Sequence, residues 1–428
     1  MEFHHICVIG LGYIGLPTAS MFAAKGVRVT GVDNNTHVID SLQHGKVHIF
    51  EPGLNEVVKE ALDLGTLEVA SRPVEADAFI IAVPTPFHDD KKADLSYVRS
   101  AAEAIVPVLR PGNLVVLEST SPPLTTREVV QPILERSGLA AGRDFLLAYS
   151  PERVLPGQIM KELVENARVI GGIDEASAQA GSDLYRIIVK GEIVLTDATT
   201  SEMVKLMENT YRDVNIAIAM EFSRLADRFG VDIWEALAIA NRHPRVNILN
   251  PGPGVGGHCI SVDPWFLVEK APDITPLIHT ARLVNDGQPA FVLQVIKRII
   301  PQLQGKRIAV LGLAFKPDVD DLRESPAIEV VNLLVEAGAV VTACEPFRPD
   351  FALEDATITG DLPAALREAE VIILLVGHAQ FKSLDPAAVA ELTRARLVLD
   401  IVNGFQRAAW ESAGFTLEKL GDRKNSKV

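Results

Sequence analysis

The sequence has few cysteines, no long apolar run and no excess of positive charge. Its 428 residues include only three cysteines, Cys7, Cys259 and Cys344, without the paired spacing of a zinc site. Such an odd, small number argues against a disulfide framework or a metal site and favours a reducing compartment, so we expect a cytoplasmic protein. No stretch approaches the roughly 20 apolar residues that a membrane helix needs, and the apolar start lacks a basic leader region. These absences predict a protein that is neither secreted nor membrane-spanning.

Acidic residues outnumber basic ones. There are 56 Asp and Glu against 41 Lys and Arg, for a net charge of −15. A surface this acidic disfavours non-specific contact with nucleic acid or with an anionic membrane, so we expect neither as a partner. Any anionic ligand must then be held by local basic groups. At about 150 residues per domain the chain has room for about three domains, and 48% hydrophobic residues supply ample core material.

Short apolar runs separated by helix-like segments occupy the first part of the chain, which is typical of a doubly wound parallel sheet. These runs are residues 5–10, 27–33, 78–83, 114–117, 145–148 and 168–170. The same alternation restarts after Lys306, in runs at 307–312, 340–345, 371–376 and 397–400. Between them, residues 201–229 and 276–300 predict two long helices. The predicted fold is α/β, with two Rossmann-like doubly wound domains (1–198 and 301–428) joined by a central all-helical domain (199–300).

A glycine motif stands where the first predicted strand meets the first helix. It reads Gly10-Leu-Gly12-Tyr13-Ile14-Gly15, and Asp33 ends the second strand. In this order the glycines allow a tight turn and close approach to a pyrophosphate, while the acid accepts hydrogen bonds from a ribose and repels a 2′-phosphate. The motif therefore predicts NAD rather than NADP. The second α/β part begins Gly312-Leu-Ala-Phe-Lys-Pro317, which lacks two of these glycines, so we expect it to bind something other than NAD, or nothing.

Three further features each allow two interpretations. Lys205, Asn209 and Arg212 share one helix face, which could be a solvated stripe, although the surrounding apolar residues favour burial. Cys259 lies in a glycine-rich loop four residues before Asp263, where a thiol can be a nucleophile or a spectator. Lys316 and Arg323 could hold a ligand phosphate or could form ordinary ion pairs with nearby acids.

Seven segments in order give the chain a family resemblance. They are residues 10–17, 83–86, 118–122, 150–153, 205–209, 256–259 and 312–316. Together they resemble the nucleotide-sugar 6-dehydrogenases of the UDP-glucose/GDP-mannose dehydrogenase family over nearly the whole chain. Residues 241–266 are most similar to the bacterial branch that acts on UDP-N-acetyl-D-mannosamine.

The resemblance implies a four-electron oxidation of the sugar C6 alcohol to a carboxylate, with two NAD molecules used in succession and Cys259 as a covalent nucleophile. The other implied catalytic residues are Lys205, Asn209, Asp263, Glu152 and Thr120. The implied NAD contacts are Gly10, Gly12, Tyr13, Ile14, Gly15, Asp33, Thr85, Thr120 and Arg323. The implied UDP-sugar contacts are Arg153, Val154, Lys205, Asn209, Arg212, His243, Arg245, Gly256, Phe315 and Lys316.

The resemblance also implies a homodimer through the central helices, and it contains one departure. Relatives usually carry Arg or Lys where this chain has Val402, which removes a cation from the uridine side. UDP-N-acetylglucosamine and UDP-glucose remain alternative substrates. A two-electron hydroxyacid dehydrogenase, which needs no thiol, and a non-catalytic NAD sensor are the alternative functions.

Overall fold

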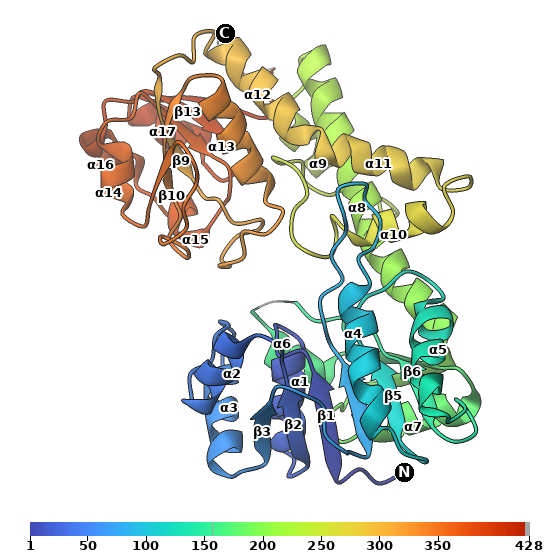
Figure 1. The fold of residues 1–428 in the computed structure, drawn as a ribbon. Helices are drawn as coiled ribbons and strands as arrows, with labels where there is room; N and C mark the ends of the chain where they lie inside the picture. The colour runs from blue at the N-terminus through green and yellow to red at the C-terminus, as the bar shows by residue number, and fades with distance from the viewer. Residues whose placement is uncertain (156, 424–428) are drawn as a thin grey trace. The chain divides into compact units, whose positions relative to one another are not determined.

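The computed structural model describes residues 1–155 and 157–423, which form two compact units (Figure 1). The first unit contains residues 1–208 and 265–274, and the second contains residues 209–264 and 275–423. Each unit is built around one sheet, as the sequence predicted. No helix in the described ranges combines the length and the apolar character needed to cross a bilayer.

The first unit contains an eight-stranded sheet in the order β3-β2-β1-β4-β5-β6-β7-β8. All neighbouring strands are parallel except the β6–β7 pair. The strands are β1 (His5–Ile9), β2 (Arg28–Val32), β3 (Leu67–Ala70), β4 (Ala78–Ile81), β5 (Leu114–Leu117), β6 (Leu146–Tyr149), β7 (Arg168–Gly172) and β8 (Ile193–Asp197). The order 3-2-1-4-5-6 is that of a dinucleotide-binding fold, whose ligand binds at the carboxyl ends of the strands where the order reverses.

Helices connect these strands and cover the faces of the sheet. They are α1 (Gly15–Ala23), α2 (Thr36–Gln43), α3 (Leu54–Asp63), α4 (Ser96–Ile105), α5 (Gln131–Leu134), α6 (Ile159–Glu165) and α7 (Glu175–Tyr185). The unit also contains most of α10 (Asp263–Lys270), whose first two residues belong to the second unit. Every residue of β4 and of β5 is buried. This burial explains why continuous apolar runs, rather than alternating ones, mark the central strands in the sequence.

The second unit contains a six-stranded, fully parallel sheet in the order β11-β10-β9-β12-β13-β14. Its strands are β9 (Arg307–Leu311), β10 (Val340–Cys344), β11 (Ala356–Thr359), β12 (Val371–Leu374), β13 (Leu397–Asp400) and β14 (Thr416–Lys419). Its helices are α9 (Ile233–Ala240), α11 (Pro276–Asp286), α12 (Gln288–Ile299), α13 (Pro326–Glu336), α14 (Leu362–Leu366), α15 (Ala379–Lys382), α16 (Pro386–Leu392) and α17 (Arg407–Ser412).

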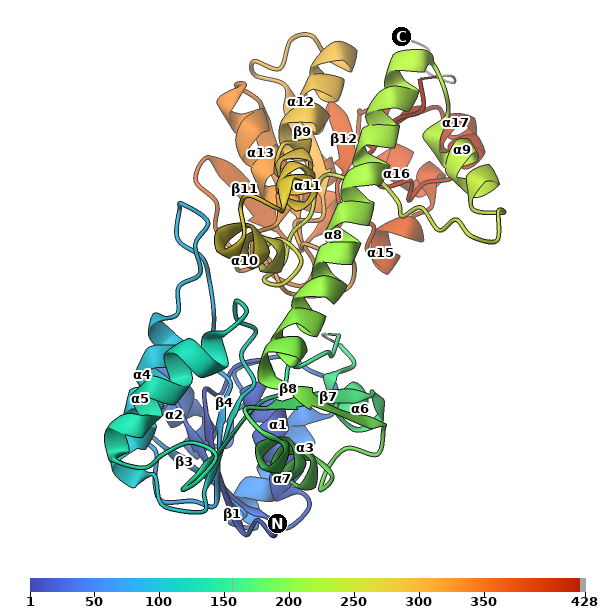
Figure 2. The ribbon, with the colours of Figure 1, turned by 90° about the vertical axis from the view of Figure 1, so that its right-hand side faces the viewer.

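The helix α8 (Ala198–Phe229) is 32 residues long and runs without interruption (Figure 2). At its start Asp197 Oδ1 accepts a hydrogen bond of 3.0 Å from Thr200 N, and Gly230 follows its end with φ +69°. Both features are typical of helix ends.

The prediction of one long helix over residues 276–300 was wrong, because this segment is not continuous. It forms two helices, α11 and α12, separated at Gly287. Pro289 lacks an N–H group and cannot donate to the preceding turn, whereas it is well tolerated in the first turn of a new helix.

Candidate active site

The glycine loop of the first unit is shaped by backbone crowding on one side and open space on the other. Gly10 has φ +95°, and a Cβ atom there would lie 2.5 Å from the carbonyl oxygen of Ala82. A Cβ at Gly15 would lie 1.8 Å from the oxygen of Gly10, whereas a Cβ at Gly12 would meet no heavy atom within 4 Å. The first and third glycines are therefore required by packing. The second faces open space, where a pyrophosphate could approach the N-terminus of α1.

Asp33 is held by the glycine loop. Its two carboxylate oxygens accept hydrogen bonds of 2.9 Å from Leu11 N and Asn35 N, and the side chain is half-buried. These bonds fix the carboxylate beside the loop, where the sequence predicted a ribose partner. His48, which sequence reasoning missed, lies near the backbone of Leu11, and its Nδ1 is buried without a hydrogen-bond partner. Burial lowers the pKa of His48. The open glycine, the fixed carboxylate and this orphaned nitrogen fit a dinucleotide.

Thr85 and Thr120 meet at the carboxyl ends of the adjacent strands β4 and β5. Thr85 Oγ1 donates a hydrogen bond of 2.6 Å to the carbonyl oxygen of Thr120. Both residues are half-buried. The structure therefore brings together the two threonines assigned to the nicotinamide side.

Glu152 lies in a buried ion network that the sequence did not reveal. One oxygen accepts a hydrogen bond of 2.9 Å from Arg168 Nη1, and the other accepts one of 2.6 Å from Arg153 N. Arg168 also donates to Glu118, which in turn accepts a hydrogen bond of 3.0 Å from Tyr185 Oη. Burial raises the pKa of Glu118 to about 7. Two carboxylates therefore share one guanidinium in an interior that leaves the Glu118 side chain 0% exposed.

The neighbouring Arg153 also has an internal partner. Its Nη2 lies 2.6 Å from Glu208 Oε1, and Arg153 Nη1 donates to the carbonyl of Ala167 at 3.1 Å. Val154 is half-buried beside it. A substrate diphosphate would have to compete with Glu208 for this guanidinium.

On α8 the burial interpretation was right for two of the three polar residues. Lys205 is 8% exposed and Asn209 is 6% exposed, whereas Arg212 faces solvent. Asn209 Nδ2 donates a hydrogen bond of 2.5 Å to Asp263 Oδ2 at the start of α10. This bond brings together two residues that lie 54 positions apart in the chain and that the family resemblance assigned to catalysis.

The Cys259 loop packs on residues 315–326 of the same unit. A Cβ at Gly256 would lie 2.4 Å from the oxygen of Glu324, and one at Gly257 would lie 2.9 Å from the Phe315 ring. Gly257 N donates to the carbonyl of Arg323 at 3.0 Å. The glycines therefore admit this neighbouring segment, and Cys259 is left half-buried at the start of the turn into α10.

The other two cysteines are buried in strands, as expected. Cys7 and Cys344 are both 0% exposed, and burial raises the pKa of their thiols to about 11 and about 12. Among the cysteines, Cys259 alone is partly accessible.

Arg323 and Lys316 both have contacts within the second unit. Arg323 donates from Nε and Nη2 to the two oxygens of Asp321, at 2.9 and 2.7 Å. Lys316 Nζ lies 5.8 Å from the centre of the Phe315 ring, and both residues are half-buried.

His243 and Arg245 are exposed on the loop that follows α9. Arg245 N lies 3.3 Å from His243 Nδ1, so this bond stays within the loop.

Next to Val402 lies a lysine that belongs to the strand β14. Lys419 Nζ donates to Asn403 Oδ1 and, at 2.8 Å, to the carbonyl of Phe405. Only the fold, through the pairing of Asp400 with Lys419 in neighbouring strands, reveals this lysine.

The acid at the end of β10 has the same place as Asp33 but a different environment. Glu345 Oε2 accepts hydrogen bonds of 2.7 and 3.0 Å from Leu313 N and Ala314 N, and it lies 3.3 Å from His378 Nε2. Glu345 and His378 are both 0% exposed. This carboxylate is covered and cannot reach a ribose, which agrees with the expectation that this half does not bind NAD.

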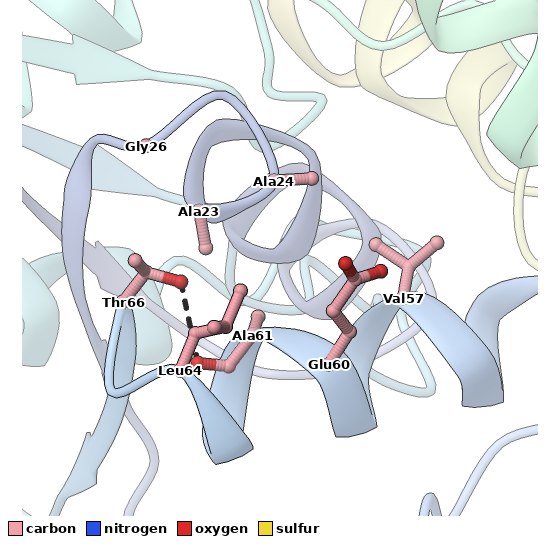
Figure 3. A pocket seen from close by; sticks show the side chains of 8 residues that line it. All are labelled: Ala23, Ala24, Gly26, Val57, Glu60, Ala61, Leu64 and Thr66. Carbon is pink, nitrogen blue, oxygen red and sulfur yellow. Dashed lines mark hydrogen bonds between the residues drawn. The ribbon is translucent and has the colours of Figure 1, made fainter.

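A small cavity in the first unit lies away from the glycine loop (Figure 3). Its lining comes from the C-terminal end of α1, from α3 and from the segments that follow them: Ala23, Ala24, Gly26, Val57, Glu60, Ala61, Leu64 and Thr66. The glycine loop instead adjoins the N-terminal end of α1. With one carboxylate and mostly apolar side chains, this cavity offers nothing that would hold a phosphate.

Comparison with known proteins agrees with this geometry. Residues 4–189, 199–287 and 309–407 match the NAD binding, central and UDP binding domains of the UDP-glucose/GDP-mannose dehydrogenase family. The UDP-N-acetyl-D-mannosamine dehydrogenase of Methanocaldococcus jannaschii is 47% identical over 427 residues, covering 98% of this chain and 97% of that protein. The NDP-N-acetyl-D-galactosaminuronic acid dehydrogenase of Ralstonia nicotianae is 47% identical over 413 residues, covering 94% and 96%.

Solved structures give the same result. The structure of UDP-D-ManNAc dehydrogenase from Pyrococcus horikoshii has a TM-score of 0.90 and 41% identity, covering 98% of this chain and 100% of that chain. The family matches together span most of the sequence. The chain therefore belongs to the UDP-glucose/GDP-mannose dehydrogenase family.

Proposed function

We propose that this protein oxidises UDP-N-acetyl-D-mannosamine at C6 to UDP-N-acetyl-D-mannosaminuronate. The oxidant is NAD, which accepts a hydride in each of two successive steps. The observation that carries the proposal is the partly accessible Cys259 beside the Asn209–Asp263 hydrogen bond, in a chain 47% identical to a protein named for this activity. A thiol is needed for a four-electron oxidation but not for a two-electron one.

Different residues serve the successive steps of the oxidation. As the first hydride leaves C6, a base takes the hydroxyl proton, and the buried Lys205 either exchanges this proton or stabilises the oxygen as a cation. Cys259 Sγ then adds to the aldehyde carbon, forming a thiohemiacetal that keeps the aldehyde from escaping. Loss of the second hydride and of the hydroxyl proton gives a thioester.

Water completes the reaction. It adds to the thioester carbon, the C–S bond breaks, and the carboxylate leaves while the thiol is restored. The Asn209 amide is suited to stabilising the oxyanion, because its bond to Asp263 fixes its orientation. The family resemblance also assigns Glu152 and Thr120 to catalysis, and Arg168 fixes the Glu152 carboxylate.

Cofactor and substrate contacts follow the same division. The loop of Gly10, Gly12 and Gly15 would hold the pyrophosphate of NAD on its open side at Gly12, Asp33 would bind its ribose, and Thr85 and Thr120 would line the nicotinamide side. Tyr13, Ile14 and Arg323 complete the NAD contacts. The UDP-sugar is held by Arg153, Val154, Lys205, Asn209, Arg212, His243, Arg245, Gly256, Phe315 and Lys316.

The chain functions as three parts: an NAD-binding part (residues 1–198), a helical middle part (199–300) and a UDP-binding part (301–428). The family matches support this division. We place the protein in the cytoplasm, where NAD and nucleotide sugars are available and where free thiols stay reduced.

A second copy of this chain covers one face of α8. Tyr211, Ile218, Phe222, Leu225 and Phe229 are exposed, and at 100° per residue they lie within about 60° of one another on the helix. A continuous exposed apolar stripe of this kind is typical of an interface. Sedimentation analysis tests the dimer: we expect a dimer for the wild type and a monomer for Leu225→Glu, and a monomeric wild type would refute this part of the proposal.

A substrate panel tests the activity. We expect two NADH per sugar, with UDP-N-acetylmannosamine preferred over UDP-N-acetylglucosamine and UDP-glucose. UDP-N-acetylgalactosamine belongs in the panel because the similarity to the Ralstonia enzyme is equally high. A clear preference for one of the other sugars would overturn the substrate, and one NADH per sugar would favour a two-electron dehydrogenase. Binding of NAD without turnover of any sugar would favour a sensor.

A further inference from the structure

His378 is a buried histidine directly before α15, and both nitrogens of its ring have partners. The backbone amide of Asp318 donates a hydrogen bond of 2.9 Å to Nδ1, and Nε2 lies 3.3 Å from Glu345 Oε2. The side chains of His378 and Glu345 are both 0% exposed. The ring therefore joins the carboxylate at the end of β10 to the segment that follows β9.

These partners determine which ring nitrogen carries the hydrogen. A backbone N–H can only donate, so Nδ1 must be the acceptor. Burial disfavours the ionised form of Glu345, but hydrogen bonds from His378 and from the amides of Leu313 and Phe347 lower the pKa of this carboxyl below its ordinary value. An ionised carboxylate can only accept, so Nε2 must donate. His378 is therefore a neutral imidazole with its hydrogen on Nε2.

The two side chains hold residues 313–318 at both ends. Glu345 Oε2 accepts hydrogen bonds of 2.7 and 3.0 Å from the first two amides of this segment. At the other end Asp318 has φ +60°, a left-handed conformation that a residue with a side chain adopts when neighbouring bonds support it. Its N–H is bound by His378, and its carboxylate accepts a hydrogen bond of 2.9 Å from Ala379 N.

The segment between these two ends carries Phe315 and Lys316, which the proposed function assigns to the UDP-sugar. The Phe315 ring lies against the loop that leads to Cys259, because a Cβ at Gly257 would lie 2.9 Å from it. Lys316 Nζ lies 5.8 Å from the centre of the same ring. A binding segment that is ordered in advance does not have to be ordered when the ligand arrives, and this raises affinity.

We propose that His378 is a positioning residue for the UDP-sugar. By accepting the Asp318 N–H while it donates to Glu345, it fixes residues 313–318, so that Phe315 and Lys316 stand ready for the substrate. This inference rests on the proposed binding of a UDP-sugar by these two residues.

Two substitutions separate the two hydrogen bonds of the ring. In His378→Asn the amide oxygen can take the place of Nδ1 and still accept from Asp318 N, whereas in His378→Gln the longer side chain reaches towards Glu345 and leaves the Asp318 N–H without an acceptor. Calorimetric titration of the full-length protein with UDP-N-acetylmannosamine, without NAD, measures the affinity. We expect His378→Gln to bind about tenfold more weakly than the wild type, and His378→Asn to bind within about threefold of it.

A double-mutant cycle with Lys316→Ala distinguishes positioning from a general loss of stability. If His378 acts through Lys316 and Phe315, adding His378→Gln to Lys316→Ala should weaken binding by at most about threefold more. A further tenfold loss would show that His378 acts elsewhere and would overturn the proposal. Equal binding by the wild type and His378→Gln would overturn it as well.

Hydrogen exchange of the ligand-free wild type gives a measurement that needs no variant. The amides of Leu313, Ala314, Phe315 and Asp318 all donate hydrogen bonds, so we expect a peptide that covers them to exchange slowly before any UDP-sugar is added. Rapid exchange of this peptide would mean that the segment is not fixed in advance, and would overturn the proposal whatever the variants show.

The chain supplies its own controls. His279→Gln, an exposed position on α11 of the same unit, should bind the UDP-sugar like the wild type. Every variant should keep the wild-type affinity for NAD, because the proposed cofactor site lies in the first unit. If the wild type itself does not bind UDP-N-acetylmannosamine, the proposed function and this inference both fail. If it binds but His378→Gln binds equally well, this inference alone fails.

Discussion

Glu118 offers a quantitative test of the buried network behind Glu152. Glu118 and Glu152 both bind Arg168, so one positive charge faces two negative ones where water cannot screen them. Burial raises the pKa of Glu118 from 4.5 to about 7, which at about 1.4 kcal/mol per pH unit corresponds to roughly 3 kcal/mol against its ionised form. Glu118→Gln keeps an acceptor oxygen for Arg168 and Tyr185 but carries no charge at any pH. The variant therefore isolates the cost of the second carboxylate.

The direction with pH follows from proton binding. The folded protein holds the Glu118 proton more tightly than the unfolded chain does, so the wild type loses stability as the pH rises from about 4.5 to about 7. The variant lacks this loss. Between pH 5.5 and pH 8.5 we expect the variant to gain about 2 kcal/mol relative to the wild type. For a unit of this size that widens the difference in Tm by about 4 to 8 °C.

Scanning calorimetry at the two pH values measures this difference in Tm. Glu128→Gln, an exposed glutamate of the same unit, serves as the control and should keep a constant difference from wild type. If Glu118→Gln instead loses stability relative to the wild type between pH 5.5 and pH 8.5, the ionised pair with Arg168 is net stabilising and the reasoning is refuted.

Three further predictions concern the cofactor loop and the thiol. Gly12→Ala should keep the wild-type Tm but bind NAD more than tenfold more weakly, because its Cβ enters only open space. Gly15→Ala should lower both the Tm and the affinity for NAD, since its Cβ would lie 1.8 Å from the Gly10 oxygen. Calorimetry and NAD titration measure these two quantities. Asp33→Ala should lower the preference for NAD over NADP in kcat/KM by at least tenfold, and an unchanged ratio would remove Asp33 from ribose recognition. Cys259→Ser should yield aldehyde and at most one NADH per sugar, as product analysis by mass spectrometry would show.

The parts of the fold that the sequence predicted are those whose physical cause is local. Continuous apolar runs mark strands such as β4 and β12, because helices cover both faces of the sheet there. The strands that sequence reasoning missed, β3, β8, β11 and β14, lie at or near the sheet edges. In β8 the apolar run is only three residues long, Ile193 to Leu195, and no residue of the strand is fully buried.

The same distinction holds in the active site. The glycine loop and Asp33 were predictable because their spacing along the chain reflects one strand, one turn and one helix. The role of Arg168 in the ion network could not be predicted, because its partner Glu118 lies 50 residues away. In the sequence, a buried arginine at the start of a strand cannot be told from an exposed one. His378 was likewise missed, since its partners Asp318 and Glu345 lie 60 and 33 positions away in the chain.

The two sheets also show that the acid after the second strand does not by itself define a dinucleotide site. Asp33 and Glu345 both accept a hydrogen bond from the amide that follows the first glycine of their loop. The difference lies in what covers them. Asp33 keeps an exposed edge, whereas His378 lies over Glu345 and packs against Phe347 and Phe381, with ring centres 5.0 and 5.4 Å away. In the second unit the carboxylate that could bind a ribose instead holds the loop leading to Phe315 and Lys316. An acid at the same place in the fold thus stays partly exposed beside the glycine loop in one half and is covered by a histidine in the other.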